Sequence, residues 1–510
     1  MDLTEELTDT FARRVWQAVL KFPDNPALEL DDRHYTYREL YDTASSISQS
    51  ILELDDQCPY VAIMADKSFT CFAGILGILL AGKAYLPLNP RFPAARNLYM
   101  LEKARVRVVV AGESSDDELE HILDNRAEEI FIIFPEEVEM SQHSNIVPKI
   151  VSAEDPAYLL FTSGTTGKPK GVPVSNGNVT SYVDHMQHSY DFRTDDRFTQ
   201  IFDLTFDLSV HDIFLAWSSG ACLCVPKDSS SFAMARFIHE KQPTVWFSVP
   251  SVVVLMDRMR LLKPGTFPSV RHSFFCGEAL QVKSAKSWKT AAPQSRMVNL
   301  YGPTEATIAI SKYDLPGNPD EWKSELGIIS LGKIFNGNSF ILKGEVSQAH
   351  QGELCLSGRQ VVNSYFENEE ADQDAYFTEP VSREKYYKTG DIVRIDEEGD
   401  LYFLGRKDAE VKISGYRVNL KEIENVISGY ESVEQAVVIY EAADELGIIM
   451  AFILSGNKEK NVEKDLDAFC RQKLPWYMVP GKFIFVEEIP LNVNGKVDVT
   501  SLKNKYIHGT

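Results

Sequence analysis

An apolar run at residues 157–161 leads without a break into a loop rich in hydroxyl groups and glycine. The run has the length and composition of a buried β-strand. Glycines let the backbone turn tightly and approach a ligand closely. Backbone N–H groups, hydroxyls and ammonium groups together suit a polyphosphate. The strand in front and the two lysines at fixed spacing favour a phosphate-binding loop over a flexible surface loop. The loop residues are Thr162, Ser163, Gly164, Thr165, Thr166, Gly167, Lys168, Pro169, Lys170 and Gly171.

This loop is not the Walker A motif of P-loop NTPases. Walker A requires a glycine, four residues, and then Gly-Lys-Ser/Thr. Here Gly164 and Gly167 enclose only two residues, and Pro169 follows Lys168. Proline lacks an N–H donor and resists a helix start directly behind the lysine. The spacing excludes a P-loop ATPase and requires a nucleotide-phosphate loop of another kind.

The chain of 510 residues is too long for one ordinary core, so two or more domains are expected. Strand-like runs at residues 61–64, 106–110 and 130–134 alternate with helical patterns such as 37–52. Thr36 and Glu39 form a capping-box pattern at the start of that helix. This alternation predicts an α/β fold, a large N-terminal domain of mixed, largely parallel sheets with flanking helices.

The pattern of expected helices and strands changes after a charged turn at residues 406–408. A helix is expected around 421–427, strands at 437–439 and 448–454, and a helix at 462–474. This pattern predicts a small α+β domain, with the boundary near Asp408. We therefore divide the chain into residues 1–407 and 408–510.

Charge and cysteine content restrict the possible partners and compartment. The net charge of −22 disfavours nucleic-acid binding, which needs a basic face. The seven scattered cysteines have no metal-ligand spacing and fit reduced thiols in the cytoplasm. The acidic N-terminus lacks a signal peptide, and the longest apolar run, residues 71–82, is too short to span a membrane. It is expected to form a buried helix.

A second strong signal is the segment Asn299 to Glu305. Gly302 and Pro303 make a rigid turn after an apolar strand. The turn presents the Tyr301 ring, the Thr304 hydroxyl and the Glu305 carboxylate at neighbouring positions. An aromatic face suits a purine, and a carboxylate can hold Mg²⁺ against phosphates.

Each of three later segments is weak evidence of a functional site when taken alone. Their order along the chain makes them informative together. Residues 387–391 end in Asp391, whose carboxylate can accept both hydroxyls of a ribose, and Arg406 follows in the segment 404–408. Residues 411–419 contain Lys412 and Gly415. Residues 490–498 place Lys496 after Asn-Gly, on a predicted tight turn.

Together these motifs, in this order, resemble those of the adenylate-forming enzymes: acyl-CoA synthetases, firefly luciferase and the adenylation domains of nonribosomal peptide synthetases. The resemblance covers roughly residues 20 to 505. It departs at Asn176, where many relatives have His, and at Phe403, where many have Tyr. Residues 491–496 also differ, because the usual Leu-Thr-Pro-Asn-Gly-Lys is here Leu-Asn-Val-Asn-Gly-Lys.

The resemblance implies ATP and Mg²⁺ as cofactors and a small C-terminal domain that rotates about a hinge at Asp408. It assigns catalytic roles to Lys496, Thr304, Glu305 and Lys412, with Glu305 on the metal and Gly415 lining a thiol tunnel. The nucleotide would be bound by Thr162, Ser163, Gly164, Thr165, Thr166, Gly167, Lys168, Lys170, Gly277, Glu278, Ala279, Asn299, Tyr301, Gly302, Asp391 and Arg406.

The segment 202–214 is decisive for the class of substrate. By resemblance, Asp207 corresponds to the aspartate with which amino-acid-activating members pair the α-amino group. A buried carboxylate needs a cationic partner, which an ammonium substrate supplies. The alternative is that Asp207 only caps the helix that follows.

Phe274 and Cys276 in the segment 274–278, the residues 206–213 and the turn 249–251 resemble those of D-alanine–carrier-protein ligases. The Phe274 wall predicts a small amino acid, with D-alanine as the leading candidate. His211 replaces an apolar residue and either packs or contacts a polar side chain. The predicted substrate-binding residues are Asp207, Leu208, His211, Ser248, Phe274, Cys276, Leu300, Ile308 and Ala309.

The expected reaction forms an aminoacyl adenylate and transfers the aminoacyl group to the phosphopantetheine thiol of a separate carrier protein. No carrier segment follows Lys496, so the chain is expected to be a free-standing enzyme or an excised domain. An acyl- or aryl-CoA ligase is the nearest alternative, because it would keep the nucleotide motifs and lack the amine requirement. A non-catalytic nucleotide-binding protein is a further alternative.

Overall fold

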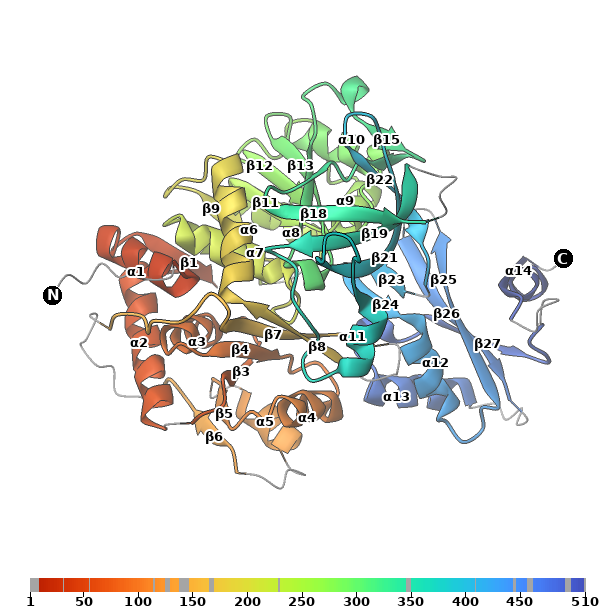
Figure 1. Ribbon diagram of the computed structural model, residues 1–510, viewed down its shortest axis with the longest axis horizontal. Helices are drawn as coiled ribbons and strands as arrows, with labels where there is room; N and C mark the ends of the chain where they lie inside the picture. Colours follow the sequence, from red (N-terminus) through yellow and green to blue (C-terminus); the bar gives the residue numbers. More distant parts are fainter. Residues whose placement is uncertain are drawn as a thin grey trace.

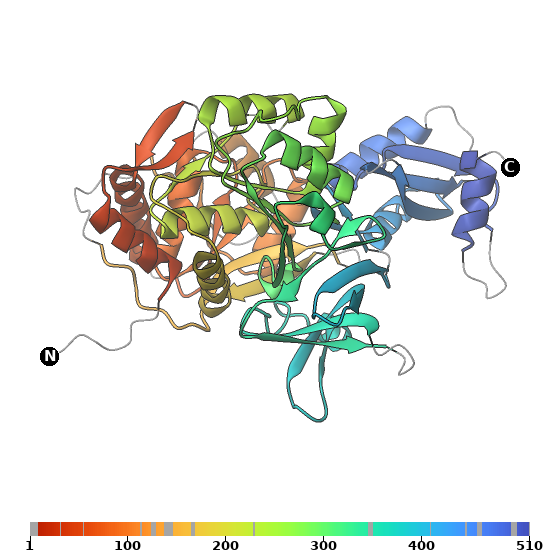
Figure 2. The ribbon, with the colours of Figure 1, turned by 90° about the horizontal axis from the view of Figure 1, so that it is seen from above.

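The computed structural model describes most of the 510-residue chain. The residues described are 9–30, 32–54, 56–112, 115–123, 129–136, 146–164, 169–227, 230–344, 350–408, 410–443, 446–455, 462–490 and 497–508. In the described part of the chain, three large sheets and one two-stranded sheet precede Asp408, and a small α+β unit follows it at one end of the molecule (Figures 1 and 2).

The first sheet has six strands in the order β6-β5-β3-β4-β7-β8. Its strands are parallel except for the antiparallel pair β7 and β8, which meet at the predicted phosphate loop. The strands are β3 (Tyr60–Met64), β4 (Ala84–Leu88), β5 (Val108–Val110), β6 (Phe131–Ile133), β7 (Pro156–Thr162) and β8 (Lys170–Ser175).

The second sheet has nine strands in the order β17-β14-β13-β12-β11-β9-β10-β1-β2. Its central strands are parallel, so their carboxyl ends meet at one edge of the sheet. The strands are β1 (Pro26–Leu30), β2 (Arg33–Thr36), β9 (Arg197–Thr199), β10 (Cys222–Cys224), β11 (Val245–Ser248), β12 (His272–Phe275), β13 (Arg296–Tyr301), β14 (Ser311–Asp314) and β17 (Lys333–Ile334).

Helices fill the space between these two sheets and cover both outer faces. The largest apolar cluster joins both sheets through α1, α2, α3, α6 and α7, while α4 and α5 cover the first sheet and α8, α9 and α10 the second. The helices are α1 (Phe11–Lys21), α2 (Tyr37–Glu53), α3 (Phe69–Leu80), α4 (Ala94–Lys103), α5 (Asp116–Leu123), α6 (Asn176–Ser189), α7 (Leu208–Ser218), α8 (Ser231–Lys241), α9 (Pro250–Arg258) and α10 (Val282–Ala291).

A third, antiparallel sheet lies to one side of these layers, below them in the view of Figure 2. It has the order β18-β19-β21-β20, with β22 paired to β21. Its strands are β18 (Asn338–Lys343), β19 (Gln351–Gly358), β20 (Tyr376–Thr378), β21 (Lys385–Ile395) and β22 (Leu401–Arg406). Nearby lie the pair β15 (Ser324–Glu325) and β16 (Ile328–Ile329), helix α11 (Glu369–Ala375) and the short helices η2 (Thr304–Ala306) and η3 (Pro319–Glu321).

The described residues after Asp408 form a hairpin, a three-stranded sheet, three α-helices and the short helices η4 and η5. Its described strands pair only with one another. The hairpin, α12 and α13 pack on one face of the sheet, and α14 on the other. The elements are β23 (Glu410–Ile413), β24 (Tyr416–Asn419), α12 (Leu420–Ser428), β25 (Gln435–Ala443), β26 (Leu446–Leu454), α13 (Val462–Lys473), η4 (Trp476–Met478), β27 (Lys482–Val486), α14 (Val499–Lys503) and η5 (Asn504–His508).

These elements confirm the predicted α/β architecture. The capping box between Thr36 and Glu39 is present at the start of α2. The apolar run at 71–82 lies mostly within α3, whose side chains after Phe69 are all buried. Within the described residues, no helix is both long and apolar enough to cross a membrane.

Candidate active site

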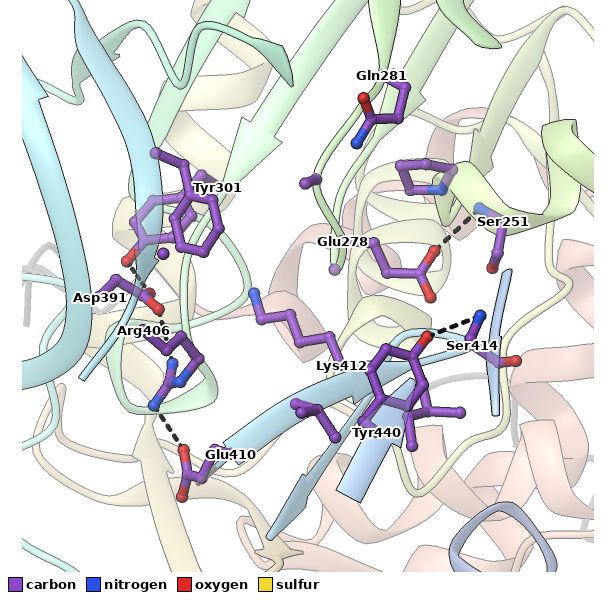
Figure 3. Close-up of a pocket in the computed structure, with 18 of the residues that line it drawn as sticks. Ser251, Glu278, Gln281, Tyr301, Asp391, Arg406, Glu410, Lys412, Ser414 and Tyr440 are labelled. Atoms are coloured by element: carbon purple, nitrogen blue, oxygen red, sulfur yellow. Dashed lines mark hydrogen bonds and ion pairs between the residues drawn. The ribbon is translucent and has the colours of Figure 1, made fainter. Parts of the chain in front are cut away.

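The predicted nucleotide residues converge where the two large sheets, the third sheet and the C-terminal hairpin meet. Tyr301 ends β13, and its hydroxyl donates to Asp391 Oδ2 of β21 at 2.5 Å. Arg406 of β22 donates from Nη1 to Asp391 Oδ1 at 2.7 Å. Figure 3 shows Tyr301, Asp391 and Arg406 along one side of the pocket. A chain of hydrogen bonds thus fixes the ring and the carboxylate predicted to hold adenine and ribose.

A cavity of about 460 Å³ opens beside this group of residues. Tyr301 and Asp391 form one wall, and Gly277, Glu278 and Ala279 form another. Gly277 has φ +85°, a conformation that favours glycine. Further lining residues include Pro250, Ser251, Val254, Gln281, Leu300, Phe403, Lys412, Ser414 and Tyr440. The cavity therefore joins the predicted nucleotide residues to residues of the C-terminal domain.

The phosphate loop is described at its two ends, whereas Thr165, Thr166, Gly167 and Lys168 lie outside the described residues. Ser163 donates from its hydroxyl to the Arg417 carbonyl at 2.7 Å, and Gly164 N–H donates to Glu422 Oε2 at 3.3 Å. Lys170 lies 4.5 Å from the centroid of the Tyr365 ring, and burial lowers its pKa. Both described ends therefore lie at the junction with the C-terminal domain.

Glu305, the predicted metal ligand, is fully buried on η2. Arg417 Nη1 lies 3.0 Å from each of its carboxylate oxygens, and the Tyr365 hydroxyl donates to Oε1 at 2.6 Å. Burial acts to raise the pKa of Glu305, but the charges of Arg417 and Lys170 outweigh it and hold the pKa below its usual value. The carboxylate is an anion already paired with protein groups.

These contacts do not leave room for a metal ion in this arrangement. Mg²⁺ bonds oxygen at about 2.0–2.1 Å and needs several ligands in near-octahedral geometry. Arg417 Nη1 occupies the position in front of both Glu305 oxygens. In the described part of the chain, no group of three or more His, Cys, Asp or Glu residues could hold a metal.

Asp207 lies buried at the start of α7 and makes no capping hydrogen bond to that helix. Burial raises its pKa to about 7, while interactions with Thr304 and Lys412 act in the opposite direction. The structure therefore gives no support to the alternative hypothesis that Asp207 only caps the helix that follows it. Its position near Thr304 and Lys412 places it beside the predicted site of chemistry.

The predicted side-chain pocket is densely packed. His211 Nδ1 and the Tyr182 hydroxyl share a hydrogen bond of 2.5 Å, and the His211 ring lies 4.0 Å from the Phe247 ring centroid. Burial lowers the pKa of His211 to about 3, so the ring is neutral. The other apolar residues predicted for the pocket belong to the large buried cluster that also contains Phe247. They are Leu208, Phe274, Cys276, Leu300, Ile308 and Ala309.

Two predicted site residues point elsewhere. Ser248 Oγ accepts a hydrogen bond from Trp246 Nε1 at 2.9 Å, on the face of β11 opposite to Phe247. The assignment of Ser248 to the pocket is corrected: Phe247 supplies the wall against His211. The Asn299 amide donates to the carbonyls of Ile329 and Ser330, so its side chain holds β13 in place.

The hairpin β23–β24 connects the hinge region to the site. Arg406 donates to both oxygens of Asp408 at 2.8 Å each, next to the predicted hinge. At the hairpin tip, Gly415 N–H donates to Glu278 Oε1 at 2.9 Å. Lys412 Nζ lies 5.6 Å from the centroid of the Tyr301 ring. The C-terminal domain thus inserts its first hairpin between the predicted nucleotide and substrate residues.

Lys496 lies outside the described residues. Of the residues that flank it, Asp498 N–H donates to the Pro490 carbonyl at 2.8 Å. Val497 packs with the cluster on the α14 face of the C-terminal sheet, whereas the hairpin packs with the cluster on the opposite face.

Sequence reasoning missed Arg417, Glu410 and Tyr365. Arg417 lies inside the motif 411–419, but nothing in that motif shows that its partner is Glu305, 112 residues away. Tyr365 lies in no recognised motif. A buried arginine between two acids is visible only after folding.

Two family models match this sequence. The model described as AMP-binding enzyme covers residues 15–366, and the model described as AMP-binding enzyme C-terminal domain covers residues 422–496. The chain belongs to the AMP-binding enzyme family.

Similar proteins include members of this family from bacteria. Tyrocidine synthase 1 of Brevibacillus parabrevis is 30% identical over 491 residues, 94% of this chain and 44% of that protein. Bacitracin synthase 3 of Bacillus licheniformis is 29% identical over 95% of this chain and 8% of that protein. The chain spans less than half the length of these two curated relatives.

Two solved structures match nearly the whole chain. The Vibrio cholerae adenylation domain AlmE, crystallised with glycyl-adenosine-5'-phosphate, has a TM-score of 0.87 and 29% identity and covers 99% of both chains. The crystal structure of IdnL7 has a TM-score of 0.72 and 30% identity and covers 98% of this chain and 99% of that one. These matches confirm the predicted fold with its C-terminal domain.

Proposed function

We propose that this AMP-binding enzyme activates a small amino acid with ATP and transfers it to a thiol. The observation that carries the proposal is Asp207, a buried carboxylate to which no basic residue in the described part of the chain is bonded, beside the residues predicted to bind ATP. A substrate ammonium group supplies the cation that such a carboxylate needs. A fatty or aryl acid has no group to pair with it.

In the first step, an oxygen of the amino-acid carboxylate attacks the α-phosphorus of ATP, and pyrophosphate leaves. The barrier comes mainly from bringing one anion against another, so positive charge and positioning are what the protein must provide. We assign these roles to the phosphate loop with Lys168 and Lys170, to Thr304 and to Lys496. Tyr301 and Asp391 hold adenine and ribose.

In the second step, a thiol sulfur attacks the carbonyl carbon, the carbon–oxygen bond to phosphate breaks, and AMP leaves. Lys412 and the Gly415 turn then lie beside the site, as they do in the structure. We assign the thiol to the phosphopantetheine arm of a carrier protein, and we assign the change between the two steps to rotation of the C-terminal domain about Asp408.

A small side chain is favoured by the dense packing around His211. The neutral His211 ring is held between Tyr182 and Phe247, so it acts as a wall. The bound ligand of AlmE is a glycyl adenylate, which supports glycine beside D-alanine as the substrates to test first. The chain is similar to AlmE over its full length.

ATP–pyrophosphate exchange with glycine, D-alanine, L-alanine and larger amino acids tests this proposal. Exchange with a small amino acid that Asp207→Asn abolishes would support it. Exchange driven by acetate, propionate or benzoate, unaffected by Asp207→Asn, would favour the acyl- or aryl-CoA ligase. Absence of exchange with every acid would favour the non-catalytic nucleotide-binding protein.

A further inference from the structure

Positive charge is concentrated on α9, α10 and the loop between them, although the whole chain has a net charge of −22. Between residues 258 and 289, Glu278 is the only acid in the sequence. The lysines and arginines of the same segment are Arg258, Arg260, Lys263, Arg271, Lys283, Lys286 and Lys289. Arg271 pairs with buried Asp196, and Lys289 is partly buried. The remaining exposed residues, Arg258, Arg260, Lys263, Lys283 and Lys286, are here called the basic face.

The two helices bring the charges of the basic face together. The Ser287 hydroxyl of α10 donates to Asp257 Oδ2 of α9 at 3.0 Å, so the helices lie side by side. Arg258 directly follows Asp257, and Lys286 directly precedes Ser287. The hydrogen bond between the helices therefore lies between two exposed basic residues, one from each helix.

The loop after α9 extends the same surface. Gly265 N–H, two residues after Lys263, donates to the Thr290 carbonyl near the end of α10 at 2.9 Å. A hollow of about 590 Å³ lies along α10, and Lys283 and Lys286 both line it. Part of the basic face is therefore concave.

Two large apolar side chains are exposed beside these charges. Leu255 is 40% exposed and Met259 is 52% exposed, one helical turn apart at the end of α9. Ser251, one turn before Leu255 on the same side of the helix, lines the active-site cavity. Methionine and arginine are enriched in protein–protein interfaces, and an apolar stripe inside a charged surface is typical of a docking site for another protein.

Both helices begin at the active-site cavity of about 460 Å³. Ser251 of α9 and Gln281, just before α10, line it and are labelled in Figure 3. Gln281 also lines the hollow along α10, so the cavity and the hollow meet there. With a rise of 1.5 Å per residue, Met259 lies about 12 Å along α9 from Ser251. An extended phosphopantetheine arm is longer than this distance.

We propose that the basic face docks an acidic protein domain, which then inserts its thiol-bearing arm into the active-site cavity. The inference rests on the proposed adenylation function, whose second step needs a thiol acceptor. The exposed positive charges steer and orient the acidic domain, while Leu255 and Met259 supply apolar contact.

Two other occupants fit the basic face less well. A symmetric dimer through this face would place the same positive charges against one another, which is unfavourable. Coenzyme A presents phosphates but has no protein surface to cover Leu255 and Met259. An acidic domain satisfies both the charge and the apolar stripe.

Binding without turnover is the first test. The probe is the acyl carrier protein of fatty-acid synthesis, an acidic domain carrying phosphopantetheine, titrated calorimetrically into the full chain. Arg260→Glu combined with Lys286→Glu should weaken binding about 10-fold or more, and added salt should weaken binding of the unmodified chain more than that of the variant. Arg383→Glu combined with Lys333→Glu is the matched control and should bind normally. Both control residues are exposed, and Arg383, with φ +64°, shares the backbone conformation of Arg260, with φ +59°.

Single-turnover transfer from purified aminoacyl adenylate is the second test. With the carrier protein as acceptor, the Arg260→Glu and Lys286→Glu double variant should be slower by about 10-fold or more at limiting acceptor concentration. Its transfer to free pantetheine and its pyrophosphate exchange should equal those of the unmodified chain, because neither residue lines the cavity. Met259→Ser should slow transfer to the carrier about 3-fold and leave its salt dependence unchanged.

Equal losses with carrier protein and pantetheine would overturn the proposal, as would a double variant that binds the carrier as tightly as the control variant. A dimer that sedimentation detects and the double variant abolishes would assign the basic face to a second copy and also overturn it. If no acid supports pyrophosphate exchange but carrier binding responds as described, the proposed function fails while the docking surface stands. If exchange is robust but carrier binding does not respond, only the docking surface fails.

Discussion

The Gly415 N–H donates to the carboxylate of Glu278 across the domain junction, at 2.9 Å. Gly415 has φ +86°, and a β-carbon at this position would lie 2.5 Å from Val249 Cγ1. No side chain fits at the hairpin tip while this contact exists. The contact therefore restricts the docked arrangement to a glycine at 415.

Gly415→Ala should slow thioester formation at least about 10-fold and leave pyrophosphate exchange close to that of the unmodified chain. The substitution strains the backbone and pushes the hairpin away from Glu278. Single-turnover transfer from purified aminoacyl adenylate to pantetheine measures the second step alone. Gly399→Ala is the control, because Gly399 has φ +86° with no neighbouring atom within 4 Å of an added β-carbon. Equal loss in both steps would contradict the prediction.

Asp391→Asn should weaken ATP binding by about 10-fold or more, because Asp391 carries a charge-assisted hydrogen bond worth about 1.5–3 kcal/mol. The variant loses the anion that accepts from Tyr301 and Arg406. Tyr301→Phe keeps the ring and removes only one of these bonds, so its loss should be smaller. Calorimetric titration with ATP in the absence of amino acid measures both. A larger loss for Tyr301→Phe would place the main contact on the hydroxyl.

Lys496→Ala should abolish pyrophosphate exchange and spare transfer from supplied aminoacyl adenylate. Lys496 is predicted to meet both carboxylate and phosphate only in the first step, where anionic charge accumulates. Lys482→Ala offers a control, because Lys482 is an exposed lysine on β27 of the same domain. Parallel loss of both half-reactions would show that Lys496 has no step-specific role.

Local sequence signals predicted the elements well, because they act over a few residues. The Thr36 and Glu39 pair marks the start of α2, and the uninterrupted apolar run from Cys71 marks a helix buried on all sides. Gly415 was predicted only as part of a thiol tunnel, and its φ of +86°, which favours glycine, became visible in the structure. The position of the boundary near Asp408 followed from a change of pattern and stays a prediction.

Contacts between distant segments could not be predicted in the same way. Ser248 alternates with Phe247 on β11, so an error of one residue exchanges the two faces of the strand. Arg417 and Glu305 are in contact because the hairpin packs against the N-terminal domain. The periodicity of the sequence contains no information about this contact. The order of nine strands in the second sheet also depends on long-range packing.

The pH dependence of amino-acid activation provides the sharpest test of Asp207. In the chain without substrate, burial raises the pKa of Asp207 to about 7. The protonated acid cannot pair with an ammonium group, so substrate binding requires the deprotonated form. The kcat/KM for the amino acid should therefore be half its maximum near pH 7, rise to a plateau at higher pH, and approach a tenfold fall for each pH unit well below pH 7. The KM for ATP should not follow this curve.

Asp207→Glu separates this titration from other groups. Glutamate keeps an acid at the site but moves it by one methylene, so kcat/KM should drop while a pH-dependent fall on the acidic side remains. Asp207→Asn should remove most of the activity, and any residual activity should lose that dependence. A fall below pH 7 that persists unchanged in Asp207→Asn would assign the titration to another residue and leave Asp207 without its proposed role.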